Sequence, residues 1–114
     1  MPSVESYEFG RIVIDGRTYT NDVIIGPDKV LSPWWRKEGH RLCIDDLKGA
    51  LDFKPSVIVI GTGYYGCMVV PEEVRKLLEE MGIRVEIANT SKACSIYNEL
   101  KETSVVVAAL HLTC

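Results

Sequence analysis

The sequence has no basic excess, no closely spaced cysteine pair and no long apolar run. Lysine and arginine total 13 against 16 aspartates and glutamates, which gives a net charge of −3. Proteins that bind duplex nucleic acid usually carry a basic excess, so we expect no nucleic-acid partner. The longest apolar stretches, Val57–Ile60 and Val105–Leu110, are much shorter than a membrane span. We therefore expect no association with a membrane.

The cysteine spacing offers no metal or redox motif. Cys43, Cys67, Cys94 and Cys114 lie far apart in the sequence, whereas zinc and dithiol sites usually contain a CxxC pair. We expect no metal and no cofactor. Residues 1–6 contain neither a basic start nor an apolar run, so they do not resemble a signal peptide. A cytoplasmic protein with reduced thiols is the resulting prediction.

The 114 residues, 46% of them apolar, suffice for one domain with an ordinary core. The chain changes character near residue 40. Residues 1–39 are rich in predicted strands, and Asp15-Gly16 between alternating apolar residues is a strong hairpin signal. Residues 40–114 alternate predicted strands and helices, so the fold class is α/β.

The second part contains three predicted helices and three predicted strands. The helices are Asp45–Leu51, a segment opened by Pro71 and ended by Gly82, and a segment capped within Asn89–Ser91 and running to Leu100. In the middle helix one apolar stripe is expected, formed by Val74, Leu77, Leu78 and Met81. The strands are Ser56–Ile60, Ile83–Ile87 and Ser104–Leu110.

A glycine motif, Gly61-Thr62-Gly63-Tyr64-Tyr65-Gly66, follows the predicted strand Ser56–Ile60. With Glu86 further on, it matches a dinucleotide-binding fingerprint. The motif does not open a helix, because five residues separate it from any helix start, the last of them Pro71. The predicted helix then begins with Glu72-Glu73, whose charges would repel a phosphate. A sharp turn off the sheet is the preferred interpretation, and nucleotide binding is a third functional hypothesis.

Several ordered segments resemble the Mth938-like proteins. They are Val57–Gly63, Val70-Pro71, Leu78, Met81–Ile83, Val85, Thr90, Ala93, Tyr97–Leu100 and His111–Cys114, with Trp35-Arg36 and Gly39-His40 earlier in the chain. The resemblance implies a three-layer domain, with a mixed central sheet, flanking helices and an additional layer formed by an N-terminal β-hairpin. It implies no established catalytic activity. Relatives in the family include a vertebrate adipogenesis-associated protein and mitochondrial complex I assembly factors.

Two connections remain available for function, about Gly26–Arg41 and Gly61–Pro71. Ligands commonly bind where strands end in an α/β sheet. The predicted binding residues are Arg36, His40, Gly61, Thr62, Gly63, Tyr64, Tyr65 and Cys67. Arg36 could bind a carboxylate or phosphate in a bidentate manner. The preferred interpretation is that one tryptophan of Trp34-Trp35 anchors this connection and Arg36 pairs with a carboxylate.

Three residues are weak catalytic candidates. Cys67 could be a nucleophile, although a buried and inert thiol is the preferred interpretation. His111 and Cys114 form an H-x-x-C pair, for which a packed histidine and a frayed cysteine are preferred to metal ligands. Of the adjacent Tyr64 and Tyr65, one is expected to be exposed, because an extended segment cannot turn both inward.

The leading hypothesis is a small non-catalytic binding or accessory protein. It would use a crevice between the connection Trp34–His40 and the loop Gly61–Cys67, as a monomer or homodimer, for a protein partner or a small anionic ligand. The alternative is a small enzyme in which Cys67 or Cys114 is the nucleophile and His40 or His111 is the base. Measuring the reactivity of the four thiols would distinguish the binding-protein hypothesis from the enzyme hypothesis.

Overall fold

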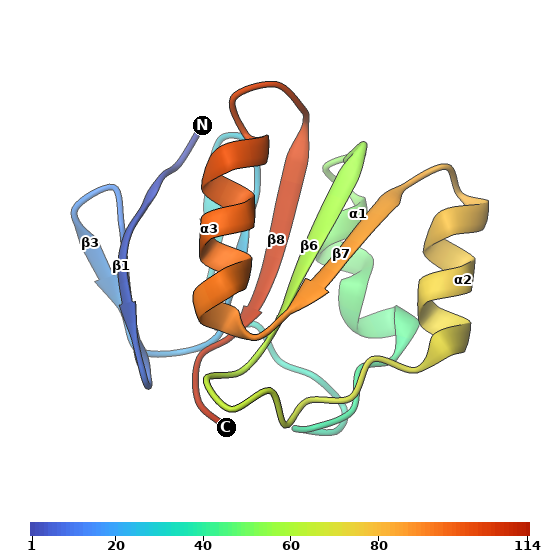
Figure 1. The fold of residues 1–114 in the computed structure, drawn as a ribbon, viewed down its shortest axis with the longest axis horizontal. Helices are drawn as coiled ribbons and strands as arrows, with labels where there is room; N and C mark the ends of the chain where they lie inside the picture. Colours follow the sequence, from blue (N-terminus) through green and yellow to red (C-terminus); the bar gives the residue numbers. More distant parts are fainter.

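A computed structural model describes residues 1–114, and its centre is a five-stranded sheet of order β5-β4-β8-β6-β7. The strands of this sheet are β4 (Val23–Ile25), β5 (Val30–Leu31), β6 (Val57–Thr62), β7 (Arg84–Ala88) and β8 (Val106–His111). β6 runs parallel to β7 and β8, whereas β8 is antiparallel to β4. The mixed central sheet that the family resemblance implies is therefore confirmed (Figure 1).

A second sheet of three antiparallel strands packs beside helix α3. Its strands are β1 (Val4–Glu8), β2 (Arg11–Ile14) and β3 (Arg17–Tyr19). Asp15 and Gly16 join β2 to β3, and both have positive φ, as a two-residue hairpin turn requires. The β-rich residues 1–39 thus contribute to both sheets, because β4 and β5 belong to the central one.

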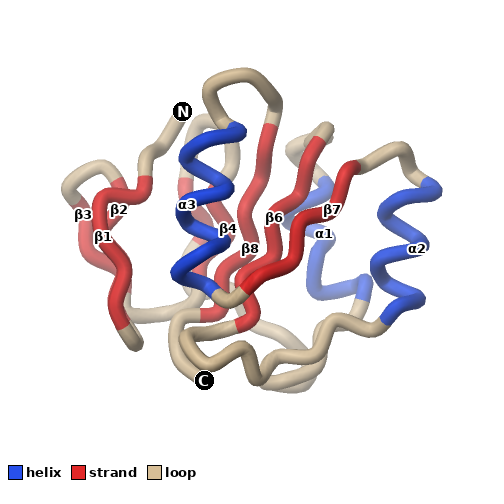
Figure 2. Tube along the Cα trace, viewed as in Figure 1, coloured by secondary structure: helices blue, strands red, loops and turns tan.

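The helices cover both faces of the central sheet (Figure 2). On one face lies α3 (Thr90–Leu100), followed outward by the small sheet. On the other lie a 3-10 turn (Ile44–Leu47), α1 (Lys48–Leu51) and α2 (Glu72–Glu80). Alternate residues of β6 point to opposite faces, Val57 and Val59 to one core and Ile58 and Ile60 to the other. This explains why the strand is apolar at consecutive positions.

The structure corrects three details of the predicted elements. β6 continues through Gly61 and Thr62, which are buried in the strand. The predicted helix Asp45–Leu51 begins as a 3-10 turn at Ile44. In α2 the apolar stripe is only partly buried, because Leu77 is 44% exposed and Met81, which follows the helix, is 57% exposed. α2 lies beside the edge strand β7, so the sheet covers only part of its surface (Figure 1).

Candidate functional site

The carboxyl ends of the parallel strands bring the predicted site residues to one end of the central sheet. Thr62 at the end of β6 pairs with His111 at the end of β8. The loop after β6, the segment after β8 and the chain terminus at Cys114 lie together at this end (Figure 1). The connection containing Arg36 and His40 reaches the same end through contacts with His111.

Most backbone amides of the glycine loop form hydrogen bonds within the protein. The Gly63 amide donates to Oγ1 of Thr90 at 2.9 Å. The amides of Tyr64 and Cys67 donate to the backbone oxygens of Thr113 (2.7 Å) and Cys114 (2.9 Å). A dinucleotide pyrophosphate is normally bound by free amides at the start of a helix. From Gly63 to Cys67, every amide except that of Tyr65 therefore already has a protein partner.

Close packing explains two of the glycines. A Cβ atom at Gly61 would lie 2.8 Å from Oγ1 of Thr90. Gly63 has a φ of +106°, and a Cβ atom there would lie 2.4 Å from the carbonyl carbon of Cys114. The glycines allow the start of α3 and the end of the chain to approach β6. The predicted turn is only partly right, because Gly61 lies within the strand and the chain leaves the sheet after Thr62.

Thr90 connects three elements at this end of the sheet. Its buried hydroxyl accepts from the Gly63 amide and donates to the backbone oxygen of His111 at 2.6 Å. Thr90 was not among the predicted site residues. Its position at the beginning of a predicted helix indicated only a capping residue, for which threonine is a common choice. In the structure Asn89 occupies that capping position and accepts from the Lys92 amide.

Asp22, Arg36 and His111 form a polar network beneath the surface. Oδ2 of Asp22 lies 2.8 Å from Nη2 of Arg36 and 2.8 Å from Nδ1 of His111. Its Oδ1 accepts from the Leu112 amide at 2.7 Å. The side chains of Arg36 and His111 are only 5% and 7% exposed. Asp22 was not among the predicted site residues, because it lies in a short connection before β4, where an aspartate is common.

The network stabilises Asp22 as a carboxylate. Burial alone would raise its pKa, but hydrogen bonds from His111, from the Leu112 amide and from Arg36 outweigh burial, so the pKa lies below the ordinary value. With Asp22 ionised, its Oδ2 accepts from Nη2 of Arg36, and Nδ1 of His111 lies within hydrogen-bond distance of both Oδ2 of Asp22 (2.8 Å) and Nη2 of Arg36 (3.0 Å). Nε2 of His111 and Nη1 of Arg36 are buried without a hydrogen-bond partner.

The connection before β6 is anchored as the preferred interpretation predicted. Trp34 is buried, and its Nε1 donates to the backbone oxygen of Asp46 at 2.9 Å. The guanidinium of Arg36 lies 4.6 Å from the centre of the Trp34 ring and donates to the Gly39 carbonyl. The prediction that Arg36 pairs with a carboxylate is confirmed. Trp35 is 77% exposed, and His40 is exposed with its ring 5.6 Å from that of His111.

An exposed aromatic cluster lies beside this network. Ring centres of Phe9 and Tyr64 lie 6.1 Å apart, those of Phe9 and Tyr65 lie 6.0 Å apart, and those of the two tyrosines lie 5.1 Å apart. Phe9 is 48%, Tyr64 44% and Tyr65 71% exposed, so both tyrosines face solvent where one was expected to. Tyr7 supports the cluster from β1, with its ring 6.2 Å from Tyr64.

All four cysteines are free thiols in different surroundings. Cys67 is exposed, which corrects the preferred interpretation of a buried thiol. Cys114 is also exposed but is not frayed, because its backbone oxygen accepts from the Cys67 amide. Cys94 is buried in α3, and burial raises the pKa of its thiol to about 12. No hydrogen bond joins any of these thiols to His40 or His111.

The predicted crevice between the connection Trp34–His40 and the loop Gly61–Cys67 is absent, because no cavity is lined by both segments. A cavity of about 180 Å³ lies beside Asp22, Trp34 and Thr113, and no residue of the glycine loop lines it. No group of three histidine, cysteine, aspartate or glutamate side chains is arranged to hold a metal ion.

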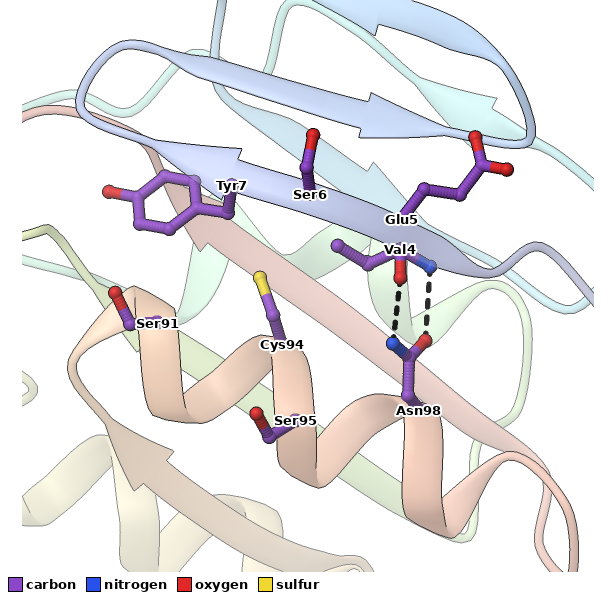
Figure 3. Close-up of a pocket in the computed structure, with 8 residues that line it drawn as sticks. All are labelled: Val4, Glu5, Ser6, Tyr7, Ser91, Cys94, Ser95 and Asn98. Carbon is purple, nitrogen blue, oxygen red and sulfur yellow. Dashed lines mark hydrogen bonds between the residues drawn. The ribbon is translucent and has the colours of Figure 1, made fainter.

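Another cavity, of about 230 Å³, lies between β1 and α3 (Figure 3). Cys94 points into it from the helix, between Ser91 and Ser95. The Asn98 carboxamide closes one end by two hydrogen bonds to the backbone of Val4, as a neighbouring strand would. Sequence reasoning placed no site here. The contacts explain how the small sheet is attached to α3.

No helix of the structure has the length and apolar character needed to cross a membrane. The fold and the site define a class: a small α/β protein with a mixed five-stranded sheet, a second sheet over α3, and a buried Asp-Arg-His network at the strand ends. Residues 4–111 match the model of a family described as protein of unknown function (DUF498/DUF598). The chain belongs to this family, the Mth938-like proteins expected from the sequence.

Solved structures share this fold over nearly the whole chain. The conserved hypothetical protein PH1505 from Pyrococcus horikoshii is 27% identical, with a TM-score of 0.83 over 98% of this chain and 99% of that one. A protein from Bordetella parapertussis is 28% identical, with a TM-score of 0.80 over 98% and 96%. A Mth938-like domain from Bordetella pertussis is 25% identical, with a TM-score of 0.76 over 97% and 85%. A search of curated proteins found no match.

Proposed function

We propose that this protein is a non-catalytic binding or accessory protein whose partner docks on the aromatic cluster Phe9, Tyr64 and Tyr65. This cluster is called the aromatic surface below. The observation that carries the proposal is that three large rings contact one another at the surface while 44–71% of each residue stays exposed. Contiguous exposed aromatic area commonly marks protein interfaces.

The aromatic surface is held in place before any partner binds. The Gly10 amide, next to Phe9, donates to the Leu112 backbone oxygen at 2.9 Å, and the Tyr64 amide donates to Thr113 at 2.7 Å. The Tyr7 hydroxyl beneath the cluster donates to the Leu112 oxygen at 2.7 Å. Both segments are therefore fixed to the same stretch after β8. A preorganised surface loses little conformational entropy on binding, which favours affinity.

The aromatic surface also has the composition of an interface. Tyrosine and phenylalanine are enriched where proteins bind one another, since they bury a large apolar area with few rotatable bonds. The hydroxyls of Tyr64 and Tyr65 form no hydrogen bond within the protein and are available to a partner. A protein partner is favoured over a small anionic ligand, because the guanidinium of Arg36 is buried and already paired with Asp22.

We assign the protein to the cytoplasm, because all four cysteines are free thiols and cysteines stay reduced in that compartment. The binding experiment should therefore be made in intact cells. A photo-reactive phenylalanine analogue is placed at Tyr65 and, as the control, at Met81. Met81 is 57% exposed and is the C-cap residue of α2, the helix that lies beside the edge strand β7 (Figure 1).

We expect irradiation to give a defined adduct from position 65 that position 81 does not give. Introducing Phe9→Ala in the same chain should abolish the adduct, since Phe9 forms part of the aromatic surface but does not carry the label. Equal adducts from both positions, or none from position 65, would overturn the proposal. An adduct with a second copy of the chain would identify the partner as the protein itself.

A further inference from the structure

Cys67 and Cys114 lie next to each other although 46 residues separate them in the sequence. The Cys67 amide donates to the backbone oxygen of Cys114 with an N···O distance of 2.9 Å. In a peptide, Cα lies about 1.5 Å from its own nitrogen and about 2.4 Å from its own carbonyl oxygen. The two Cα atoms are consequently at most about 6.8 Å apart, which lies within the range that disulfides span.

The neighbouring backbone fixes this arrangement. The Tyr64 amide donates to Thr113 at 2.7 Å, so two consecutive residues after β8 are bound to the loop. Gly63 has no side chain to separate them, and a Cβ atom there would lie 2.4 Å from the carbonyl carbon of Cys114. The loop from Gly63 to Cys67 therefore holds Cys114 in contact with the loop. Two cysteines held in this way can react with each other, whereas a single exposed cysteine reacts only with a thiol that it meets by random collision.

Accessibility distinguishes this pair from the other two thiols. Cys67 and Cys114 are both exposed, whereas Cys94 is buried in α3 and Cys43 is half-buried before the 3-10 turn. An oxidant in solution can reach a thiol only if that thiol is accessible. The same chain thus contains two accessible cysteines whose backbones are hydrogen-bonded to each other, and two less accessible ones that serve as internal controls.

We propose that Cys67 and Cys114 form a site of reversible thiol oxidation, a dithiol that low-molecular-weight disulfides convert to an intramolecular disulfide. In the first step the thiolate of either cysteine attacks a sulfur of a disulfide such as oxidised glutathione. A mixed disulfide forms and one glutathione thiolate leaves. In the second step the other cysteine thiolate attacks the protein sulfur of the mixed disulfide, and the second glutathione leaves.

The two steps balance. The protein gives up two electrons and two protons, and one molecule of oxidised glutathione becomes two of reduced glutathione. The second step is fast because the attacking thiol is already held beside the mixed disulfide, which gives it a high effective concentration. The inference does not depend on the aromatic surface and survives if no partner binds there.

The test is an equilibration of the purified chain with glutathione redox buffer, followed by acid quenching, alkylation and mass mapping. We expect the wild type to lose the mass of two hydrogen atoms and to give a peptide that links Cys67 to Cys114. The variant Cys43→Ser should behave in the same way. Cys67→Ser and Cys114→Ser should instead stop at a single glutathione adduct on the remaining cysteine of the pair.

Thermal unfolding provides a second readout. The disulfide closes a long loop, so oxidation should raise the Tm of the wild type and of Cys43→Ser by roughly 5 °C or more. It should not raise the Tm of the two single variants of the pair. Persistent glutathione adducts on both cysteines of the wild type, linkage through Cys43 or Cys94, or a disulfide only between two chains would each overturn the inference.

Discussion

Nδ1 of His111 lies 2.8 Å from Oδ2 of Asp22, at the point where Nη2 of Arg36 also meets that oxygen. This contact joins the last strand of the central sheet to the turn before β4 and to the long connection after β5. Residues distant in sequence thereby meet at one buried carboxylate. The network stabilises the end of the sheet on which the aromatic surface lies, so its removal should affect stability before it affects binding.

The variant Asp22→Asn should lower the free energy of unfolding by about 3 kcal/mol. It leaves the buried Arg36 without its counter-charge, and an unpaired buried charge is costly. Urea unfolding of wild type and variant measures the difference. The matched control is Asp45→Asn, which removes the exposed pair with Lys37 and should leave stability nearly unchanged. Equal effects of the two variants would show that the buried network adds nothing to the free energy of unfolding.

The contribution of Asp22 should disappear in acid. Its pKa is lower in the folded protein than the ordinary value of 3.8, so the folded state favours the ionised form. The stability gained is fully present above the unfolded pKa and is lost as the pH falls through the folded pKa. The difference in unfolding free energy between wild type and Asp22→Asn should therefore shrink below about pH 4. A difference that stays constant or grows there would contradict this assignment.

Gly63→Ala should destabilise the protein by about 3 kcal/mol, because the new Cβ atom combines a positive φ with a collision at Cys114. Gly39→Ala is the matched control, since nothing lies within 4 Å of a Cβ atom there and its φ is ordinary. Chemical denaturation of both variants gives the comparison. If Gly63→Ala were as stable as Gly39→Ala, the close approach of the chain end to the loop would be wrong.

Thr90→Val should cost about 2 kcal/mol of unfolding free energy. It removes the hydroxyl that serves both the Gly63 amide and the His111 oxygen while keeping the side-chain volume, and a buried group left without a partner is expensive. Thr90→Ser retains the hydroxyl and should recover most of the loss. Similar stabilities for valine and serine would show that the lost hydrogen bonds are not the cause.

Local patterns allowed much of the fold to be predicted. The consecutive apolar residues of β6, the hairpin signal Asp15-Gly16 and the cap at Asn89 each depend on neighbours in the sequence, and each appears in the structure. The exposure of Leu77 and Met81 was not predicted, because an apolar stripe does not reveal how much of it the sheet covers.

The candidate site was less predictable, since tertiary contacts create it. Arg36, His40 and His111 were singled out separately, and only the folded chain shows that they meet. Asp22 escaped notice because an aspartate in a turn is ordinary until a buried arginine reaches it. The expected crevice is also a matter of tertiary packing: no cavity in the structure is lined by both of the segments that were expected to form it.

The central claim, that partners dock on the aromatic surface, is tested most directly by the affinity of the captured partner for three purified variants. Tyr65→Ala and Phe9→Ala should each weaken binding by about tenfold or more, because they remove large side chains from the middle of the interface. Met81→Ala should bind as the wild type does, and all three variants should keep the wild-type Tm. Wild-type affinity in Tyr65→Ala and Phe9→Ala, with a loss in Met81→Ala, would contradict the account.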